Sequence, residues 1–307
     1  MDQFAPQTVD GLTIGSIYAL IALGYTLVYG VLRLINFAHS EIFSLGIFAT
    51  TFAISALGIT GARTGFALVG TLLLLMLAAM VVSGGAALLM ERVAYRPLRR
   101  RNAPRLTALI TAIGISLFVQ ELLAIRYGRS QLGSARVLEK RELLSLAGAN
   151  IRTDKVLVFV AAIVLMIGLD QFVNRSRLGR GIRATAQDAE TASLMGVDIN
   201  RVVMLTFLLG GLLAGAAGML FTIFFETARF NIGFLPGVKA FTAAVLGGIG
   251  NVRGALLGGL VLGLLENYGA TVLGGEWKDV FAFTVLVLVL LFRPSGLLGE
   301  TLGRARV

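Results

Sequence analysis

Long apolar runs without a charge are the feature of this sequence that most constrains its fold. Residues 66–82 read FALVGTLLLLMLAAMVV, and residues 280–292 read VFAFTVLVLVLLF. About 20 apolar residues, each rising 1.5 Å in a helix, cross a hydrocarbon core roughly 30 Å thick. Runs of this kind predict a protein that spans a membrane several times.

The composition supports the same class of protein. Of the 307 residues, 56% are hydrophobic and 14% are charged, whereas about a quarter of the residues of soluble domains are charged. The runs lack the polar alternation of barrel strands, so we predict an all-α, polytopic bundle of about eight membrane elements. The apolar segments are 11–32, 42–59, 65–90, 107–125, 155–173, 202–225, 238–250, 254–273 and 279–292.

Two of these segments are separated only by residues 251–253, NVR. The segment at 238–250 is short for a complete crossing, so a broken or re-entrant helix pair near 238–273 is possible.

Glycines also recur four residues apart, a spacing that lets helix backbones approach closely. These pairs are Gly11/Gly15, Gly211/Gly215, Gly254/Gly258 and Gly259/Gly263.

The basic residues predict how the chain is oriented. Arginines crowd residues 91–105 and 174–183, which are two crossings apart and therefore lie on one side of the membrane. Because basic loops stay in the cytoplasm, that side is expected to be cytoplasmic, with the N-terminus outside and the C-terminus inside. The net charge of +10 is therefore attributed to basic loops beside the lipid bilayer and not to binding of nucleic acid. Residues 126–155 are also basic, although this count places them outside.

Residues 183–201, RATAQDAETASLMGVDINR, predict a short helix on the cytoplasmic side. Thr185 and Asp188 resemble a capping box, Gly196 is a plausible stop, and Asp198 is placed to cap the next membrane helix. Ten residues from Ala186 to Met195 would form a rod of roughly 15 Å. Its apolar surface is expected at Ala189, Ala192, Leu194 and Met195, with Gln187, Asp188 and Glu190 in water. The helix could bind in a partner's groove or be a solvated connector.

Four signatures resemble one family. The pattern AxDAExAxxxG at 186–196, after GRGIRA at 179–184, resembles the coupling helix of ABC importer permeases. The other three are GLTIGSIYALIALGYTLVYGVLRLINFAH at 11–39, AFTAAVLGGIGNVRGALLGG at 240–259 and FRPSGLLG at 292–299. Together they resemble permease subunits of branched-chain amino acid importers of the LivH type. Ser40 stands where the family generally has glycine after the histidine.

The resemblance implies one permease domain, 1–307, in the bacterial inner membrane. It would form the pathway for branched-chain amino acids that a periplasmic binding protein delivers. A second homologous permease in a heterodimer and two cytoplasmic ATPases would complete the importer. The chain lacks a GxxxxGK[ST] phosphate loop, so ATP and magnesium would be used by the ATPases, and this chain would bind no cofactor and catalyse no reaction. The residues implied in coupling are Ala186, Asp188, Ala189, Glu190, Ala192, Leu194, Met195 and Gly196.

Polar residues that interrupt the apolar sequence are the candidates for the pathway or for helix breaks. Residues 35–46, INFAHSEIFSLG, hold the only histidine of the chain, and residues 246–254 form a second interruption. The favoured interpretation of the first patch is a helix break whose backbone groups need polar partners, with substrate contact as the alternative. A single histidine without companion ligands does not favour a metal site. The candidates are Asn36, His39, Glu41, Asn251, Arg253 and Glu266, of which Glu266 lies deepest in an apolar run.

Other functions remain open at this point. Close relatives of the family handle urea, short amides or other amino acids, so the solute is not determined by the resemblance. An ion-gradient-driven carrier or channel that works alone is a second class, and a non-transporting membrane scaffold is a third. A carrier of the second class would transport in liposomes without any ATPase.

Overall fold

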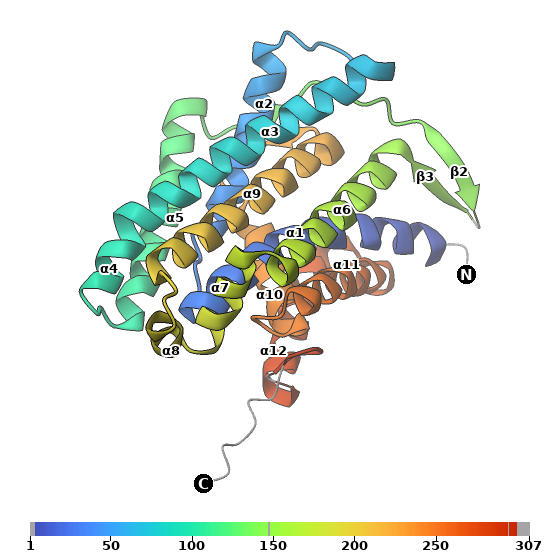
Figure 1. Ribbon diagram of the computed structural model, residues 1–307. Coiled ribbons are helices and arrows are strands. Elements are labelled where there is room, and N and C mark those ends of the chain that lie inside the picture. Colours follow the sequence, from blue (N-terminus) through green and yellow to red (C-terminus); the bar gives the residue numbers. More distant parts are fainter. Residues whose placement is uncertain (1–3, 147, 294, 300–307) are drawn as a thin grey trace.

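The computed structural model describes residues 4–146, 148–293 and 295–299, and within them the chain is a bundle of helices (Figure 1). The elements are α1 (Phe4–Leu32), α2 (His39–Ala56), α3 (Gly65–Met90), the π-helical turn η1 (Glu91–Tyr95), α4 (Arg96–Arg100), α5 (Arg105–Tyr127), β1 (Leu132–Gly133), β2 (Glu142–Leu146), β3 (Ala149–Arg152), α6 (Thr153–Arg175), α7 (Arg177–Gln187), α8 (Ala189–Leu194), α9 (Ile199–Phe225), β4 (Thr227–Ala228), α10 (Phe234–Gly247), α11 (Val252–Leu273), the 3-10 turn η2 (Gly275–Trp277) and α12 (Lys278–Phe292).

Every apolar segment of the sequence forms a helix, which confirms the predicted helical membrane bundle. Six helical spans in the described part of the chain are long and apolar enough to cross a membrane: Phe4–Leu32, Gly65–Arg100, Arg105–Tyr127, Thr153–Arg175, Ile199–Phe225 and Val252–Leu273. The apolar helices α2, α10 and α12 are shorter or less apolar. In the described residues the strands make two small antiparallel pairs, β1 with β4 and β2 with β3.

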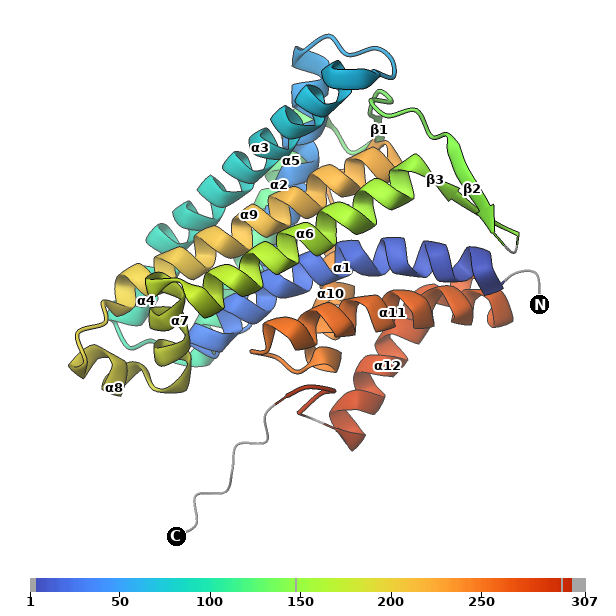
Figure 2. The same cartoon turned by 45° about the vertical axis from the view of Figure 1, so that its right-hand side comes forward.

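Helices α1 and α9 form the centre of the bundle. Helix α11 packs along α1, while α2 and α3 pack against α9 (Figure 2). The glycine spacing explains how closely α1 and α11 approach: a Cβ added to Gly263 would come within 2.3 Å of the Gly11 carbonyl oxygen. A Cβ on Gly215 of α9 would likewise come within 2.4 Å of the Ala79 carbonyl oxygen in α3. Glycine at these positions therefore sets the distance between the backbones.

Helices α10 and α11 form a tight hairpin. Gly247 lies against Gly254, and Gly258 against Ala243, so that the two backbones are in contact. Helix α10 has 14 residues and is about 21 Å long, which is less than the hydrocarbon thickness of a bilayer. The expected short element of the 238–273 pair is therefore present, and it begins at Phe234, after the irregular segment that follows α9.

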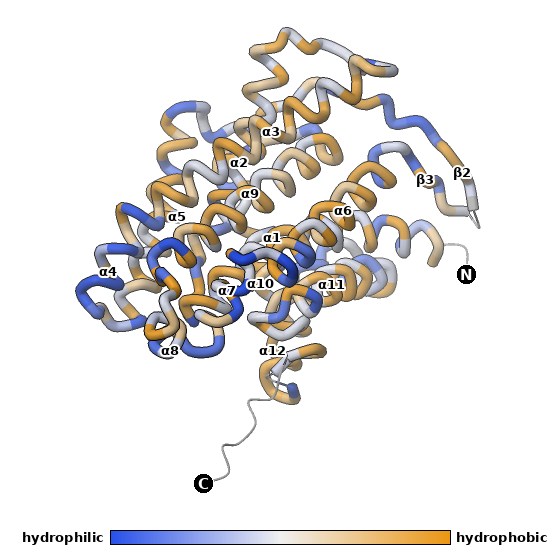
Figure 3. Tube along the Cα trace, in the orientation of Figure 1, coloured by the Kyte–Doolittle hydropathy of each residue, from blue (hydrophilic) through white to orange (hydrophobic). Residues whose placement is uncertain are grey.

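The two arginine-rich segments lie at the same end of the bundle, as predicted. Figure 2 shows α4, α7 and α8 together at one end, with the β2–β3 hairpin and the start of α1 at the other. Colouring by hydropathy shows hydrophilic residues at α4, α7 and α8, and again in the segment before β2 (Figure 3). The last residues of the expected cytoplasmic C-terminus, 300–307, lie outside the described residues.

Carboxylates neutralise most of the basic side chains of residues 126–155. The pairs are Arg129–Glu121 (2.7 Å), Arg136–Glu226 (3.0 Å), Lys140–Glu226 (2.8 Å), Arg141–Glu139 (2.7 Å), Arg152–Asp154 (2.5 Å) and Lys155–Asp10 (2.5 Å). Partial burial raises the pKa of Glu226, but its hydrogen bonds from Lys140 and Arg136 prevail, so the net shift is downward. Paired cations that tie the loop to the bundle explain why this segment is basic at the end opposite the arginine clusters.

Candidate functional site

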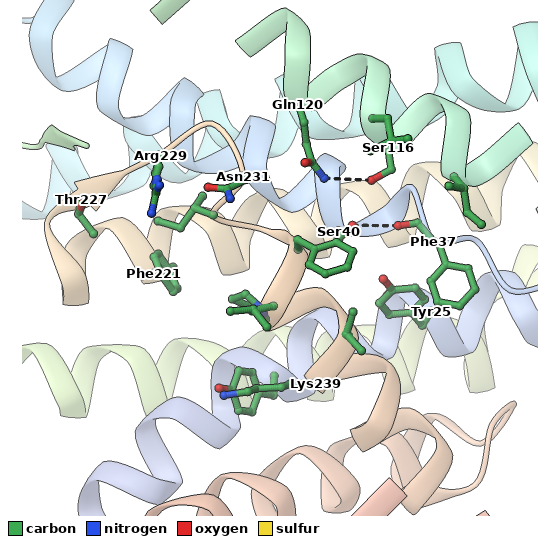
Figure 4. A pocket seen from close by; sticks show the side chains of 18 of the residues that line it. Tyr25, Phe37, Ser40, Ser116, Gln120, Phe221, Thr227, Arg229, Asn231 and Lys239 are labelled. Atoms are coloured by element: carbon green, nitrogen blue, oxygen red, sulfur yellow. Dashed lines mark hydrogen bonds between the residues drawn. The ribbon is translucent and has the colours of Figure 1, made fainter. Parts of the chain in front are cut away.

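A cavity of about 1050 Å³ opens between α1, α2, α5 and α10 (Figure 4). Its walls are mainly apolar, with a few polar side chains among them, as in many small-molecule sites. The lining residues are Tyr18, Tyr25, Phe37, Ser40, Ile113, Ser116, Leu117, Gln120, Gln131, Phe221, Thr227, Arg229, Asn231, Ile232, Phe234, Leu235, Pro236, Val238 and Lys239.

The first turn of α10 reaches the cavity because two glycines let it lie against α2. A Cβ on Gly233 would come within 2.3 Å of the Ser40 carbonyl oxygen, and a Cβ on Gly237 within 2.3 Å of the Ser40 Cβ. Ser40 is helical and buried. The Ser40 side chain is therefore accommodated by two glycines at the start of the facing helix.

Glu41, predicted as a pathway or helix-break residue, lies behind the cavity wall between α2 and α5. Its side chain is fully buried. Oε1 accepts hydrogen bonds from Gln120 Nε2 (2.8 Å) and Ser116 Oγ (3.1 Å), and Oε2 accepts one from Ser44 Oγ (3.1 Å). Ser40 Oγ also lies 3.3 Å from Oε1, but its single proton has a shorter bond to the Phe37 carbonyl, at 2.8 Å. Within residues 4–299, as far as they are described, this carboxylate has no ion-pair partner. Three neutral donors and the oxygen of a further hydroxyl group therefore surround a buried acid.

Glu266, the deepest acid predicted from the sequence, lies at the base of the cavity. Its Oε1 is 2.8 Å from Lys239 Nζ, and the two side chains are 4% and 8% exposed. Lys239 also lies 2.6 Å from Asp279 at the start of α12. Lys239, and not Glu266, lines the cavity, so the position predicted for the pathway is one side chain away from it.

Asn36 and His39 form the helix break and do not line the cavity. Asn36 Oδ1 accepts the Ala38 amide (3.1 Å) and the Tyr95 hydroxyl (2.8 Å) at the start of α2. His39 stacks edge-on against Tyr25 at 4.8 Å between centroids. A Cβ on Gly24 would overlap the imidazole ring, so the glycine makes room for the histidine. Asn36 therefore is a partner for the interrupted backbone, as the favoured interpretation of this patch has it. The imidazole of His39 is buried by packing against Tyr25 and Gly24, and its Nε2 has no hydrogen-bond partner among the described residues.

Asn251 and Arg253 belong to the turn between α10 and α11 and lie away from the cavity lining. Asn251 Oδ1 accepts the amides of Arg253 (3.0 Å) and Gly254 (3.1 Å), which caps α11. Its Nδ2 donates to the Leu298 carbonyl (2.8 Å), which attaches the following tail to the turn. Arg253 pairs with Asp170 of α6 at 3.2 Å. Both residues hold helices together, with no role as cavity walls.

The predicted single helix over 186–195 is wrong in its boundaries. The chain forms α7 up to Gln187, bends at Asp188, and forms the six-residue α8 from Ala189 to Leu194. Asp188 is the cap of α8 and not the partner in a capping box, because Oδ1 accepts the amides of Glu190 (3.0 Å) and Thr191 (3.3 Å). These bonds replace helical ones at the break. Gly196, with a φ of +85°, ends the unit, and Asp198 caps α9 as predicted.

The exposed surface of α8 differs from the prediction at one residue. Ala192 is buried against the bundle, while Leu194 and Met195 are 83% and 80% exposed. At Asp188, hydrogen bonds from the Thr191 hydroxyl and from the amides of Thr191 and Glu190 lower the pKa of the carboxyl. Arg33, directly after α1, donates to the Gln187 carbonyl at 3.3 Å. The segment therefore has an apolar tip and a direct connection to the central helix.

Comparison with known proteins identifies the family. Residues 7–290 match the family described as branched-chain amino acid transport system, permease component. The chain belongs to this permease family. It is 44% identical to the high-affinity branched-chain amino acid transport system permease protein BraD of Pseudomonas aeruginosa, over 97% of this chain and 96% of that protein. It is 41% identical to the LivH permease protein of Escherichia coli K12, over 97% and 96%. The autoinducer 2 import system permease protein LsrC of Klebsiella pneumoniae is 32% identical over 46% of this chain and 43% of that protein.

Sequence reasoning missed most of the polar residues that line the cavity of this permease. Ser116 and Gln120 are four residues apart in an apolar segment, so they share one face of α5. Lys239 is a single charge at the start of the apolar segment at 238–250, and such a residue needs a partner inside the membrane. Both signals were present in the sequence. Only the packing of α2 against both α5 and α10 brings them to one cavity with Arg229 and Asn231.

Proposed function

We propose that this chain is a permease subunit of an ATP-driven importer in the bacterial inner membrane, and that its solutes are branched-chain amino acids. The observation that carries the proposal is the cavity, in which apolar walls surround a few hydroxyl, amide and charged groups. A zwitterion with a branched apolar side chain has the complementary chemistry. The permease relatives, whose names state branched-chain amino acid transport, align over nearly the whole length of the chain.

The partners follow from the same proposal. A second homologous permease completes the pathway as a heterodimer, and a periplasmic binding protein delivers the solute. Two cytoplasmic ATPases bind ATP and magnesium, because this chain has no phosphate-binding loop of the GxxxxGK[ST] form. The end of the bundle with α4, α7 and α8 faces the cytoplasm, and the N-terminus is outside.

The mechanism has two states. The ATPases close on nucleotide and press on the 186–196 segment through its exposed tip at Leu194 and Met195. The movement reaches the central helix through α7 and the hydrogen bond from Arg33 to Gln187. The paired permeases then change from inward- to outward-facing, and the binding protein releases its amino acid into the cavity.

The decisive experiment reconstitutes the chain in liposomes with and without its ATPases, the second permease and the binding protein. We expect a stable complex whose ATP hydrolysis rises with leucine-loaded binding protein, and leucine uptake that requires ATP. Uptake by the chain alone would instead support a gradient-driven carrier. Urea, acetamide and a non-branched amino acid serve as competing solutes. Stimulation by one of these and not by leucine would overturn the proposed solute class.

A further inference from the structure

The cluster around Glu41 is a buried acid that faces the cavity through neutral donors. Its carboxylate is fully buried, and the structure shows no Lys or Arg paired with it in the described residues. A buried carboxylate without a cation is costly unless hydrogen bonds or a bound cation compensate it. The other deeply buried acids differ: Glu266 has Lys239, Asp154 has Arg152, and Glu91 has Arg96.

The donors around Glu41 form part of the cavity wall. Ser116 and Gln120 line the cavity and donate to Oε1 of Glu41. Ser40 also lines the cavity, and its Oγ lies 3.3 Å from the same oxygen. Figure 4 shows Gln120 and Ser116 on α5 facing Ser40 on α2, with the cavity beside them. The Gln120 amide, which also donates to Ser116 Oγ at 3.3 Å, therefore stands between the solute space and the carboxylate.

The chemistry of this cluster fits a primary ammonium group. An ammonium has three donors and no acceptor, and the cluster offers a carboxylate, two hydroxyl oxygens and an amide oxygen. The nearby walls at Ile113, Leu117 and Phe37 are apolar, which suits an aliphatic chain attached to the ammonium. Arg229 lines the same cavity, is exposed, and makes no ion pair in the described residues. Apart from Lys239, which is paired with Glu266, the cavity therefore has an unpaired base, Arg229, in its lining and an unpaired acid, Glu41, behind its wall.

We propose that Glu41, Ser116 and Gln120 bind the α-ammonium group of the solute, with Gln120 moving aside to admit it. This inference rests on the proposed function, which it extends by naming the group that is recognised and the residues that bind it. The ammonium replaces the Gln120 amide as a donor to Oε1, so the buried charge gains its counter-ion only when a solute is present. Charge-assisted bonds of this kind are about twice as strong as neutral ones.

The test uses a thiol reporter in the cavity. The chain contains no cysteine, so Leu235→Cys, which replaces a cavity residue that is 46% exposed, introduces its only thiol. The complete importer in native membranes is labelled with a soluble maleimide in the presence of three probes. They are leucine, 3-methylbutylamine (leucine without its carboxylate) and 4-methylpentanoate (leucine without its ammonium).

We expect leucine and 3-methylbutylamine to slow the labelling and 4-methylpentanoate to have little effect. Glu41→Gln in the same reporter background should weaken protection by the amine about tenfold or more. Glu121→Gln on α5 is the matched control, because Glu121 is exposed and paired with Arg129. In this variant the amine should slow the labelling as much as it does in the parent. If Glu41→Gln fails to accumulate, the three probes on the parent reporter still decide. The assignment would be overturned if 4-methylpentanoate protected the thiol as well as 3-methylbutylamine does. It would also be overturned if 3-methylbutylamine protected the Glu41→Gln variant as well as it protects the parent.

Leucine uptake by the assembled importer separates this inference from the proposed function. If leucine is transported but the amine gives no protection, the ammonium site is wrong and the solute class stands. If the amine protects but leucine is not transported, the ammonium site stands and the solute class is wrong.

Discussion

Lys239 Nζ lies 2.8 Å from Oε1 of Glu266, and the two buried side chains join the short helix α10 to α11 beneath the cavity. The same ammonium lies 2.6 Å from Asp279, which adds the first turn of α12 to the pair. Helix α10 is too short to cross the membrane, so its position depends on contacts with its neighbours. This ion pair holds the helix that carries one wall of the cavity.

Replacing Lys239 with Met should destabilise the protein, because it leaves Glu266 buried without a counter-ion. Loss of one partner of a buried pair costs about 3–5 kcal/mol. Thermal unfolding of the detergent-purified protein measures the change. The double variant Lys239→Met/Glu266→Met removes both charges and should recover most of the lost stability. A double variant no more stable than Lys239→Met would show that the pairing energy is not the cause.

Gly263→Val should separate α1 from α11. A Cβ at this position would lie within 2.4 Å of Gly15 Cα, so the backbones must move apart at a cost of about 1–3 kcal/mol. Gly85→Val is the matched control, since a Cβ on Gly85 in α3 meets no atom within 4 Å. We expect a lower unfolding temperature for the first variant only. Equal effects of the two substitutions would mean that glycine propensity, and not helix contact, explains the result.

Acid should loosen the segment between α5 and α6 through Glu226. Burial opposes ionisation of this carboxyl, but hydrogen bonds from Lys140 and Arg136 give it a pKa below its ordinary value. Because the pKa of Glu226 is lower in the folded protein, its stabilisation of this segment is fully present above the unfolded pKa of about 4.3. That stabilisation is lost as the pH falls through the lower pKa of the folded state. Proteolysis of residues 128–152 at a series of pH values measures this. Glu226→Gln should be cleaved faster than the parent at neutral pH, and the difference should shrink in acid.

Much of the fold was predictable from the sequence, because the length of an apolar run identifies a membrane helix. The segments, the common end of the two arginine clusters and the close glycine contacts were all predictable. The break at Asp188 was not, because aspartate is tolerated inside a helix at a modest cost and is also a favoured cap at a helix start. Whether Asp188 continues the helix or caps a new one depends on where α7 ends, and the packing of α7 determines that. Propensity alone does not contain this information.

The cavity was less predictable than the fold for a physical reason. Its walls come from segments far apart in the chain: the start of α2, the middle of α5 and the turn that precedes α10. Single-charge positions such as Glu41 and Glu266 were detectable as costly exceptions in apolar sequence. Their partners were not: Lys239 lies 27 residues from Glu266, and Gln120 lies 79 residues from Glu41.

Gly196→Pro or Glu190→Arg should abolish uptake while the chain still inserts into the membrane. Gly196 has a φ of +85°, which proline cannot adopt because its ring fixes φ near −65°. Glu190→Arg reverses the charge at the exposed first turn of α8. Uptake in proteoliposomes and the amount of protein in membranes are measured together. Normal transport by both variants would contradict the assignment of this segment to coupling.

Asp188→Ala and Asp188→Asn separate the helix cap from the charge. Hydrogen bonds from Thr191 and Glu190 lower the pKa of Asp188, so the carboxylate is ionised, and its cap is fully formed, at neutral pH and is lost only in strong acid. Asn also accepts amide bonds at a cap, whereas Ala cannot. If α8 must be a formed helix to transmit the force of the ATPases, Asp188→Ala should lose uptake while ATP hydrolysis by the complex continues, and Asp188→Asn should retain most of both. Loss of uptake in both variants, although Asp188→Asn keeps the cap, would show that a partner recognises the negative charge itself. Retention in both variants would mean that coupling does not depend on the cap, because the exposed tip at Leu194 and Met195 would then transmit force without it.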